Sequence, residues 1–219
     1  MPLPFTFDDR LHICRLMDGS FVPSVTQVMS AQGLSFNFQR YVQPDALDRC
    51  RALGTDVHAL TDTLDQDGEI PDTWLTEQTA GYVESWRGFK RISGFVPSEW
   101  SVRMCEAING FPLTGELDKY GMIGRYPAIV DIKTGARDDT HGVQTAAYEM
   151  LRFRSAKIGR LIRGVAQLFE DGSPGKLIEY PENSPMDGLS YADTFLSALQ
   201  NVHYRLRRGR LSERDFISE

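Results

Sequence analysis

The stretch from residue 114 to residue 148 constrains the fold of this chain more than any other. It contains two short apolar segments that we expect to be neighbouring strands, the first carrying Asp118 and the second carrying Asp131. Side chains alternate between the two faces of a strand, so Asp131 and Lys133 should point in the same direction. The sequence therefore predicts two carboxylates and one ammonium group at a shared edge of a sheet.

A Gly-containing turn follows the second strand and leads into a helical pattern with Gln144 and Tyr148 in its first turns. Residues four positions apart lie on one face of a helix, so this amide and this phenol should point the same way. Two carboxylates, a cation, an amide and a phenol can then converge on one point.

Such a group of side chains suits phosphodiester hydrolysis without a covalent nucleophile. Hard divalent cations prefer oxygen ligands, which Asp118, Asp131 and the backbone carbonyl of Ile132 could supply. Such a metal lowers the pKa of bound water from about 15.7 and stabilises developing charge. Lys133 could pair with a phosphate oxygen or hold the attacking water. The alternative is that an isolated D-x-K pattern is a pair of solvated surface charges.

The combined pattern resembles the PD-(D/E)XK nuclease superfamily, in particular the branch with RecB-type nuclease domains, lambda exonuclease-like enzymes and CRISPR adaptation nucleases. The segments that carry the resemblance are G-E-L-D at 115–118, D-I-K-T-G at 131–135 and Q-T-A-A-Y at 144–148. The resemblance implies an α/β (or α+β) fold with a restriction-endonuclease-like central mixed β-sheet flanked by helices. Its core would span residues 54–180.

The resemblance also implies roles for individual residues and Mg²⁺ or Mn²⁺ as cofactor. A G-x-x-x-H segment on a preceding helix matches the family's histidine near the metal, although a lone helical histidine is more often structural. Lys133 would position water, and the glutamine and tyrosine would orient the lysine or the substrate. The implied metal ligands are His58, Asp118, Asp131 and the Ile132 carbonyl, and the implied substrate-binding residues are Lys133, Gln144, Tyr148, Arg152 and Arg154.

The net charge and the cysteine content limit which partners the chain is expected to have. The formal net charge of −6 argues against nucleic acid, but local basic surface could still follow a phosphate backbone. Basic residues cluster at 152–163 and 205–210 and could equally be solvated helix faces. The three cysteines are far apart in the sequence, which does not indicate a disulfide framework or the paired spacing of a zinc site. Three cysteines are also too few for the four-cysteine iron–sulfur cluster that some members of the family carry. We expect a cytoplasmic (intracellular) protein without a membrane segment or a secretory signal.

The remaining pattern predicts one domain over residues 1–219, with a β-hairpin and helix at 1–45 and a helix at 186–208 added to the core. Residues 65–69 are interpreted as an acidic surface turn, and the tail after residue 210 as frayed. Glu99 and Glu106 are expected at the surface or behind the ligands. The further expected elements are helices at 44–64, 76–92 and 142–153 and strands at 99–107, 113–120, 126–133, 160–169 and 176–180.

The leading hypothesis is a metal-dependent DNA nuclease, with an exonuclease of recombination or repair favoured by resemblance, in a phage or mobile-element setting. A catalytically inactive domain of the same fold that binds DNA or protein is the main alternative. A metal-dependent hydrolase of small phosphate compounds is the third. The expected partner is DNA, and the resemblance leaves open a recombination or phage partner protein and a homo-oligomer.

Overall fold

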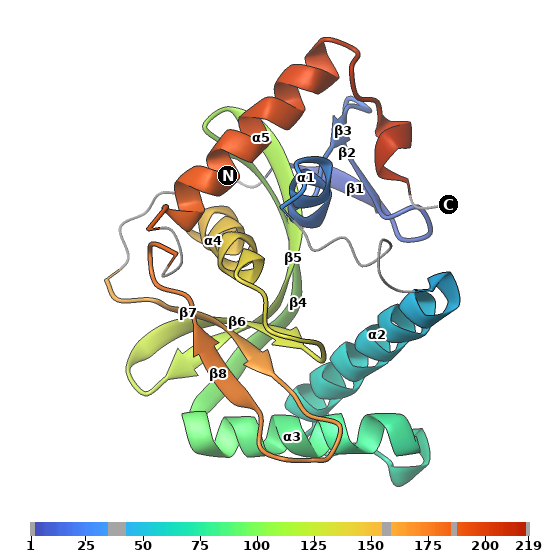
Figure 1. The fold of residues 1–219 in the computed structure, drawn as a ribbon, viewed down its shortest axis with the longest axis vertical. Coiled ribbons are helices and arrows are strands. Elements are labelled where there is room, and N and C mark those ends of the chain that lie inside the picture. The colour runs from blue at the N-terminus through green and yellow to red at the C-terminus, as the bar shows by residue number, and fades with distance from the viewer. Residues whose placement is uncertain (1–2, 35–42, 155–158, 185–187, 218–219) are drawn as a thin grey trace.

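The computed structural model describes residues 3–34, 43–154, 159–184 and 188–217 (Figure 1). Within these ranges a five-stranded sheet has the order β4-β5-β6-β7-β8. The first three strands form an antiparallel meander, β7 pairs parallel with β6, and β8 pairs antiparallel with β7. The strands of this sheet are β4 (Phe95–Ile108), β5 (Phe111–Ile123), β6 (Tyr126–Lys133), β7 (Ile162–Gln167) and β8 (Lys176–Glu179).

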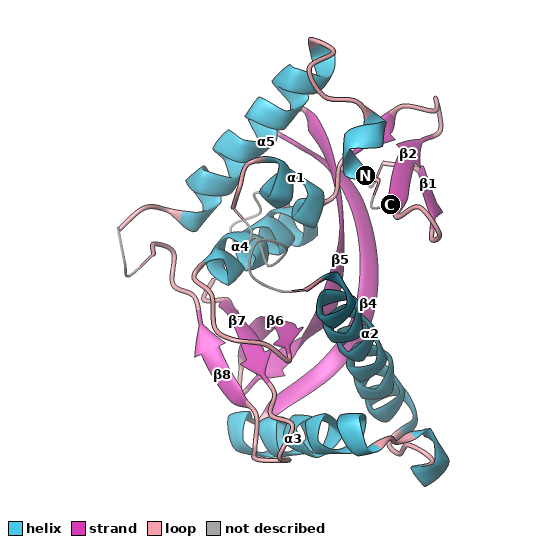
Figure 2. Ribbon diagram, turned by 45° about the vertical axis from the view of Figure 1, so that its right-hand side comes forward, coloured by secondary structure: helices cyan, strands magenta, loops and turns pink. Residues whose placement is uncertain are grey.

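Helices cover both faces of the mixed sheet, which confirms the predicted fold class (Figure 2). One apolar cluster joins α1, α4 and α5 to one face, and a second joins α2 and α3 to the other. None of the described helices is both long and apolar enough to span a membrane. The helices are α1 (Val25–Ala31), α2 (Pro44–Asp67), α3 (Glu77–Ser93), α4 (Thr140–Phe153) and α5 (Tyr191–Arg207), with 3₁₀ turns η2 (Asp72–Trp74) and η3 (Glu213–Phe216).

Strand alternation explains how one strand serves both clusters. In β6, Ile129 packs in the cluster with α4, whereas Val130 and Ile132 pack in the cluster with α2 and α3. Because side chains alternate, Asp131 shares the face of Ile129. The carboxylate is therefore placed on the α4 side of the sheet.

Local signals account for several element ends. Ser24 caps α1 through a hydrogen bond from the Gln27 backbone N–H, and the Ser24 backbone N–H donates in return to the Gln27 side-chain oxygen. Thr76 caps α3, and Gly94 ends it in a left-handed conformation. The predicted N-terminal hairpin is confirmed as part of a three-stranded sheet of β1 (Phe5–Asp8), β2 (Ile13–Leu16) and β3 (Phe21–Val22).

Three expectations were wrong in detail. The helix α2 continues through Asp67, and the side chain of Asp65 is buried instead of lying in an acidic surface turn. The last helix begins at Tyr191, after the Ser190 cap, and the expected start at Met186 lies outside the described residues. The tail forms η3, in which Phe216 packs on Phe21, so the chain is not frayed up to Phe216. The prediction of a single domain stays a prediction.

Candidate active site

The strands β5 and β6 separate at the position of Asp118. Their ladder runs from Ile123 opposite Tyr126 to Lys119 opposite Val130. One step further, the backbone N–H of Ile132 donates to Asp118 Oδ2 at 2.7 Å. A carboxylate thus accepts the bond that a strand carbonyl would otherwise take. Asp118 is consequently held against β6, where its oxygen atoms face the end of that strand.

Asp131 and Lys133 lie on the same side of β6, as the alternation predicts. Asp131 is 1% exposed, and Lys133 Nζ lies 2.6 Å from its Oδ2 as an ion pair. Among the described residues, this Oδ2 is a buried oxygen atom without a hydrogen bond of regular geometry. The ammonium of Lys133 offsets part of the cost of burying this carboxylate, and a bound cation would offset more of it.

His58 reaches the same place from the helix α2. Its Nδ1 lies 3.5 Å from Asp118 Oδ2. Burial alone would lower the pKa of His58, but Asp118 outweighs burial and raises it to about 9. Asp118 therefore favours the protonated, positively charged imidazole at neutral pH. The structure thus brings together the histidine, the two aspartates and the lysine that the sequence pattern predicted.

The two carboxylates have opposite pKa shifts. Burial would raise the pKa of Asp118, but His58 and Lys133 hold it at about 2. Burial raises the pKa of Asp131 to about 6, against the opposing effect of Lys133. Burial would lower the pKa of Lys133, but Asp131 and Asp118 outweigh it and raise the pKa. The lysine is therefore cationic beside one firmly ionised carboxylate and one that titrates near pH 6.

The glutamine and tyrosine of α4 form a buried pair. Gln144 Nε2 donates to the Tyr148 hydroxyl oxygen at 2.9 Å, and both side chains are buried. Burial, followed by the charges of Asp131 and Asp118, raises the pKa of Tyr148 well above its ordinary value. The phenol is therefore neutral, and it lies close enough to both carboxylates to sense their charge.

A pocket of about 600 Å³ lies beside this group. His58, Ile132, Lys133 and Gln144 line it, whereas Asp118 and Asp131 are not among its lining residues. It also contains Arg137 and His141, which sequence reasoning missed.

Burial and the charge of Lys133 lower the pKa of His141 to about 4, so its imidazole is neutral. Arg137 lies on the exposed loop between β6 and α4. In the sequence, Arg137 is marked only by its position as a basic residue between the strand that carries Asp131 and Lys133 and the helix that carries Gln144.

The two arginines predicted to grip phosphates are placed differently. Arg152 makes an ion pair with Glu99, and Arg154 makes one with Glu106, which is itself buried. Neither arginine lines the pocket that contains Lys133. Their contact with substrate stays a prediction, and both glutamates are accounted for by these pairs.

The donor set suits a hard divalent cation, because it offers two carboxylates and a backbone carbonyl. Across the described residues, however, no three His, Cys, Asp or Glu side chains converge as a ready metal-binding group. Within the site, His58 contacts Asp118 and Lys133 contacts Asp131. The observation that fits a cation is the buried Oδ2 of Asp131, which Lys133 contacts as an ion pair but which accepts no hydrogen bond of regular geometry from the described residues.

Comparisons with known proteins bear on the fold. No protein-family model matches the chain, and no curated protein sequence matches it. The crystal structure of a candidate exonuclease from Eubacterium rectale matches with a TM-score of 0.54 and 16% identity, over 86% of this chain and 82% of that one. The crystal structure of SSO0001 is 20% identical over 68% of this chain and 73% of its own, with a TM-score of only 0.33. The first match shows a shared fold.

Proposed function

We propose that this chain is a metal-dependent DNA nuclease that hydrolyses phosphodiester bonds, with Mg²⁺ or Mn²⁺ as cofactor. The observation that carries the proposal is the separation of β5 and β6, where Asp118 accepts a hydrogen bond from the Ile132 backbone N–H beside the ion pair of the buried Asp131 with Lys133. The fold shared with a candidate exonuclease supports it.

The side chains have separate roles in the proposed hydrolysis. Asp118, Asp131, the Ile132 carbonyl and, once deprotonated, His58 would hold the cation, which supplies Lewis acidity at the phosphate. Lys133 stays protonated through its two carboxylate neighbours. Lys133 lines the pocket, where its ammonium would pair with a phosphate oxygen or hold the attacking water. No protein nucleophile is needed.

The buried pair on α4 lies near the two carboxylates, whose charges act on Tyr148. Tyr148 is neutral, and its hydroxyl is fixed by Gln144, whose side chain also lines the pocket. A fixed dipole next to a reacting phosphate costs no reorganisation during the reaction. We assign these two residues to orienting the lysine and the substrate.

We further propose that the enzyme is an exonuclease that acts at DNA ends in recombination or repair. The test is incubation of end-labelled linear DNA and closed circular DNA with Mn²⁺, with a chelator control. The proposal expects loss of the linear species alone, and no loss with the chelator. Cleavage of the circle would refute the exonuclease mode, and stable DNA in every lane would refute the nuclease.

Asp131→Asn and Arg91→Ala make a matched pair of variants for this assay. The first removes a buried carboxylate of the site, and the second removes an exposed charge on α3. Activity that disappears only in Asp131→Asn would come from this site and not from a contaminant.

A further inference from the structure

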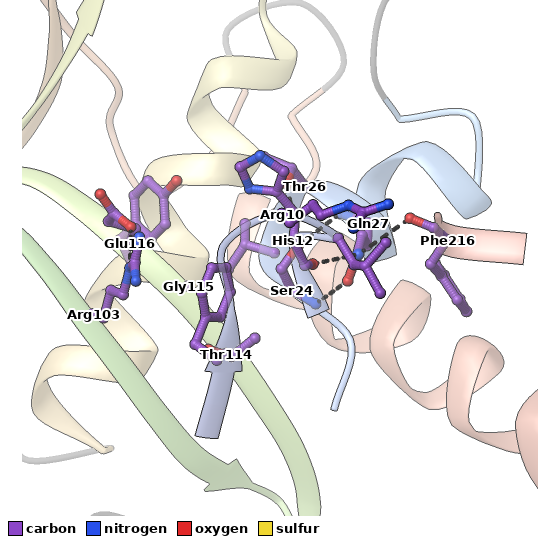
Figure 3. Close-up of a pocket in the computed structure, with 14 residues that line it drawn as sticks. Arg10, His12, Ser24, Thr26, Gln27, Arg103, Thr114, Gly115, Glu116 and Phe216 are labelled. Carbon is purple, nitrogen blue, oxygen red and sulfur yellow. Dashed lines mark hydrogen bonds and ion pairs between the residues drawn. The ribbon is translucent and has the colours of Figure 1, made fainter. Parts of the chain in front are cut away.

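A second cavity, drawn in Figure 3, shares a lining residue with the pocket of the candidate active site. Its volume is about 380 Å³. Tyr148 lines this cavity, whereas Gln144, which is bonded to Tyr148, lines the first pocket. Thr26 on α1 lines both. One threonine and the buried glutamine–tyrosine pair therefore separate two neighbouring hollows.

The walls of the second cavity come largely from segments outside the predicted nuclease core. Gln27 holds three of these segments together, as the dashed lines in Figure 3 show. Its Nε2 donates to the carbonyl oxygens of His12 and Phe216, at 3.3 Å each, and its Oε1 accepts from the Ser24 backbone N–H at 2.8 Å. The N-terminal loop, α1 and the C-terminal segment are thus fastened into one shaped wall.

The two arginines that line this cavity differ in their ion pairs. Arg103 is engaged by Glu116 at 2.6 Å and by Asp9 at 2.7 Å. Arg10, by contrast, has no carboxylate partner among the described residues, and it lies with His12 and Thr26 away from the Arg103–Glu116 pair in Figure 3. An unpaired guanidinium is therefore available on the side that contains Thr26, which both hollows share.

The loop that carries this arginine is ordered by its own backbone contacts. Asp8 Oδ1 accepts the backbone N–H groups of Arg10 and Leu11 at 3.0 Å each. His12 adopts a left-handed conformation, with φ of +51°. The loop between β1 and β2 is thus held so that the Arg10 and His12 side chains line the cavity.

We infer that this cavity binds one nucleotide of the DNA strand next to the scissile phosphodiester, with its phosphate on Arg10 and His12. The inference rests on the proposed nuclease function. The cavity is of a size for one small ligand, and its hydroxyl, amide and guanidinium lining suits a sugar–phosphate unit. Because the two hollows adjoin at Thr26, a single strand can occupy both at once.

The experiment is an equilibrium titration of the full chain with a short fluorescein-labelled single-stranded oligonucleotide, in chelator so that no cleavage occurs. Arg10→Ala should raise the Kd at least about tenfold, the factor that corresponds to ~1.4 kcal/mol. It should also reduce the slope of log Kd against log salt concentration by about 0.7, the loss expected for one phosphate contact on a single strand. Arg10→Lys should recover part of the affinity.

Arg91→Ala is the matched control, because it removes an exposed arginine on α3, and it should leave both the Kd and the slope unchanged. Thermal melts of the variants report that the fold is intact. If Arg10→Ala binds as the unsubstituted chain does while that chain cleaves DNA, the cavity inference is wrong and the nuclease proposal stands. If the unsubstituted chain neither binds nor cleaves, both are wrong.

Discussion

Replacing Lys119 with methionine tests how the helix α2 is held against the sheet. Lys119 lies on β5 and is fully buried, and its ammonium contacts Asp62 at 2.6 Å and Asp65 at 2.8 Å. The side chain of Asp65 is also fully buried, and it accepts from Lys90 at 2.5 Å and from the indole N–H of Trp86 at 3.0 Å. Methionine keeps most of the apolar stem and removes only the charge.

The expected cost follows from what the variant leaves behind. Removing one partner from a buried ion pair costs about 3–5 kcal/mol, because the other charge stays buried. Asp65 would keep the Lys90 and Trp86 contacts, and the side chain of Asp62 is 20% exposed. These remaining contacts favour the lower end, so we expect Lys119→Met to lower the free energy of unfolding by about 3 kcal/mol.

Urea unfolding measures this difference directly, and a thermal melt should show a Tm lower by about 6–12 °C for a chain of this size. Lys176→Met, which replaces an exposed lysine on β8, is the control and should be close to neutral. Adding Asp65→Asn to Lys119→Met should restore part of the loss, because the buried carboxylate then carries no charge. A loss below about 1 kcal/mol for Lys119→Met would refute the reasoning.

Three further predictions concern the site and the backbone. Asp131→Ala and Lys133→Ala should each lower DNA cleavage at least about a hundredfold, the scale of losing a positioned catalytic group; near-normal rates for both on linear DNA would contradict the site assignment. Mn²⁺ affinity should fall as the pH drops from about 9, because His58, with its pKa raised to about 9, is protonated below that pH and must lose the proton to coordinate. Calorimetry in buffers of different ionisation enthalpy should detect this proton release, and its absence would rule out His58 as a ligand. Gly121→Ala should destabilise the chain by at least about 2 kcal/mol, since its Cβ would lie 2.1 Å from a β4 carbonyl oxygen; Gly54→Ala, with no atom within 4 Å of the added Cβ, should stabilise α2 by about 0.5–1 kcal/mol. Thermal melts of the two glycine variants should therefore shift in opposite directions.

Local periodicity accounts for the part of the fold and of the site that could be predicted. Alternation along β6 places Asp131 and Lys133 on one side, and the spacing of four in α4 pairs Gln144 with Tyr148, as the structure has them. These arrangements depend on residues close in sequence. Motif resemblance added His58, whose 3.5 Å contact with Asp118 joins α2 to β5.

The missed residues depend on which surfaces meet, and no local pattern carries that information. Asp65 was interpreted as a surface residue because acidic residues follow it, yet it lies four positions after the buried Thr61 and shares that face of α2. Its partner Lys119 is 54 residues away. The loop with Arg137 and the loop with Arg10 have no periodicity, so only the folded chain shows which cavities they line.

The buried cluster and the candidate active site use the same two elements. His58, Asp62 and Asp65 are spaced four and three residues apart, which places them along one side of α2. The histidine faces Asp118, and the two aspartates face the adjacent Lys119 on β5. Bonds to a buried ammonium are directional, whereas apolar contacts permit sliding. We therefore attribute the register of α2 on β5, and with it the approach of His58 to Asp118, to a buried cation that carries a desolvation cost.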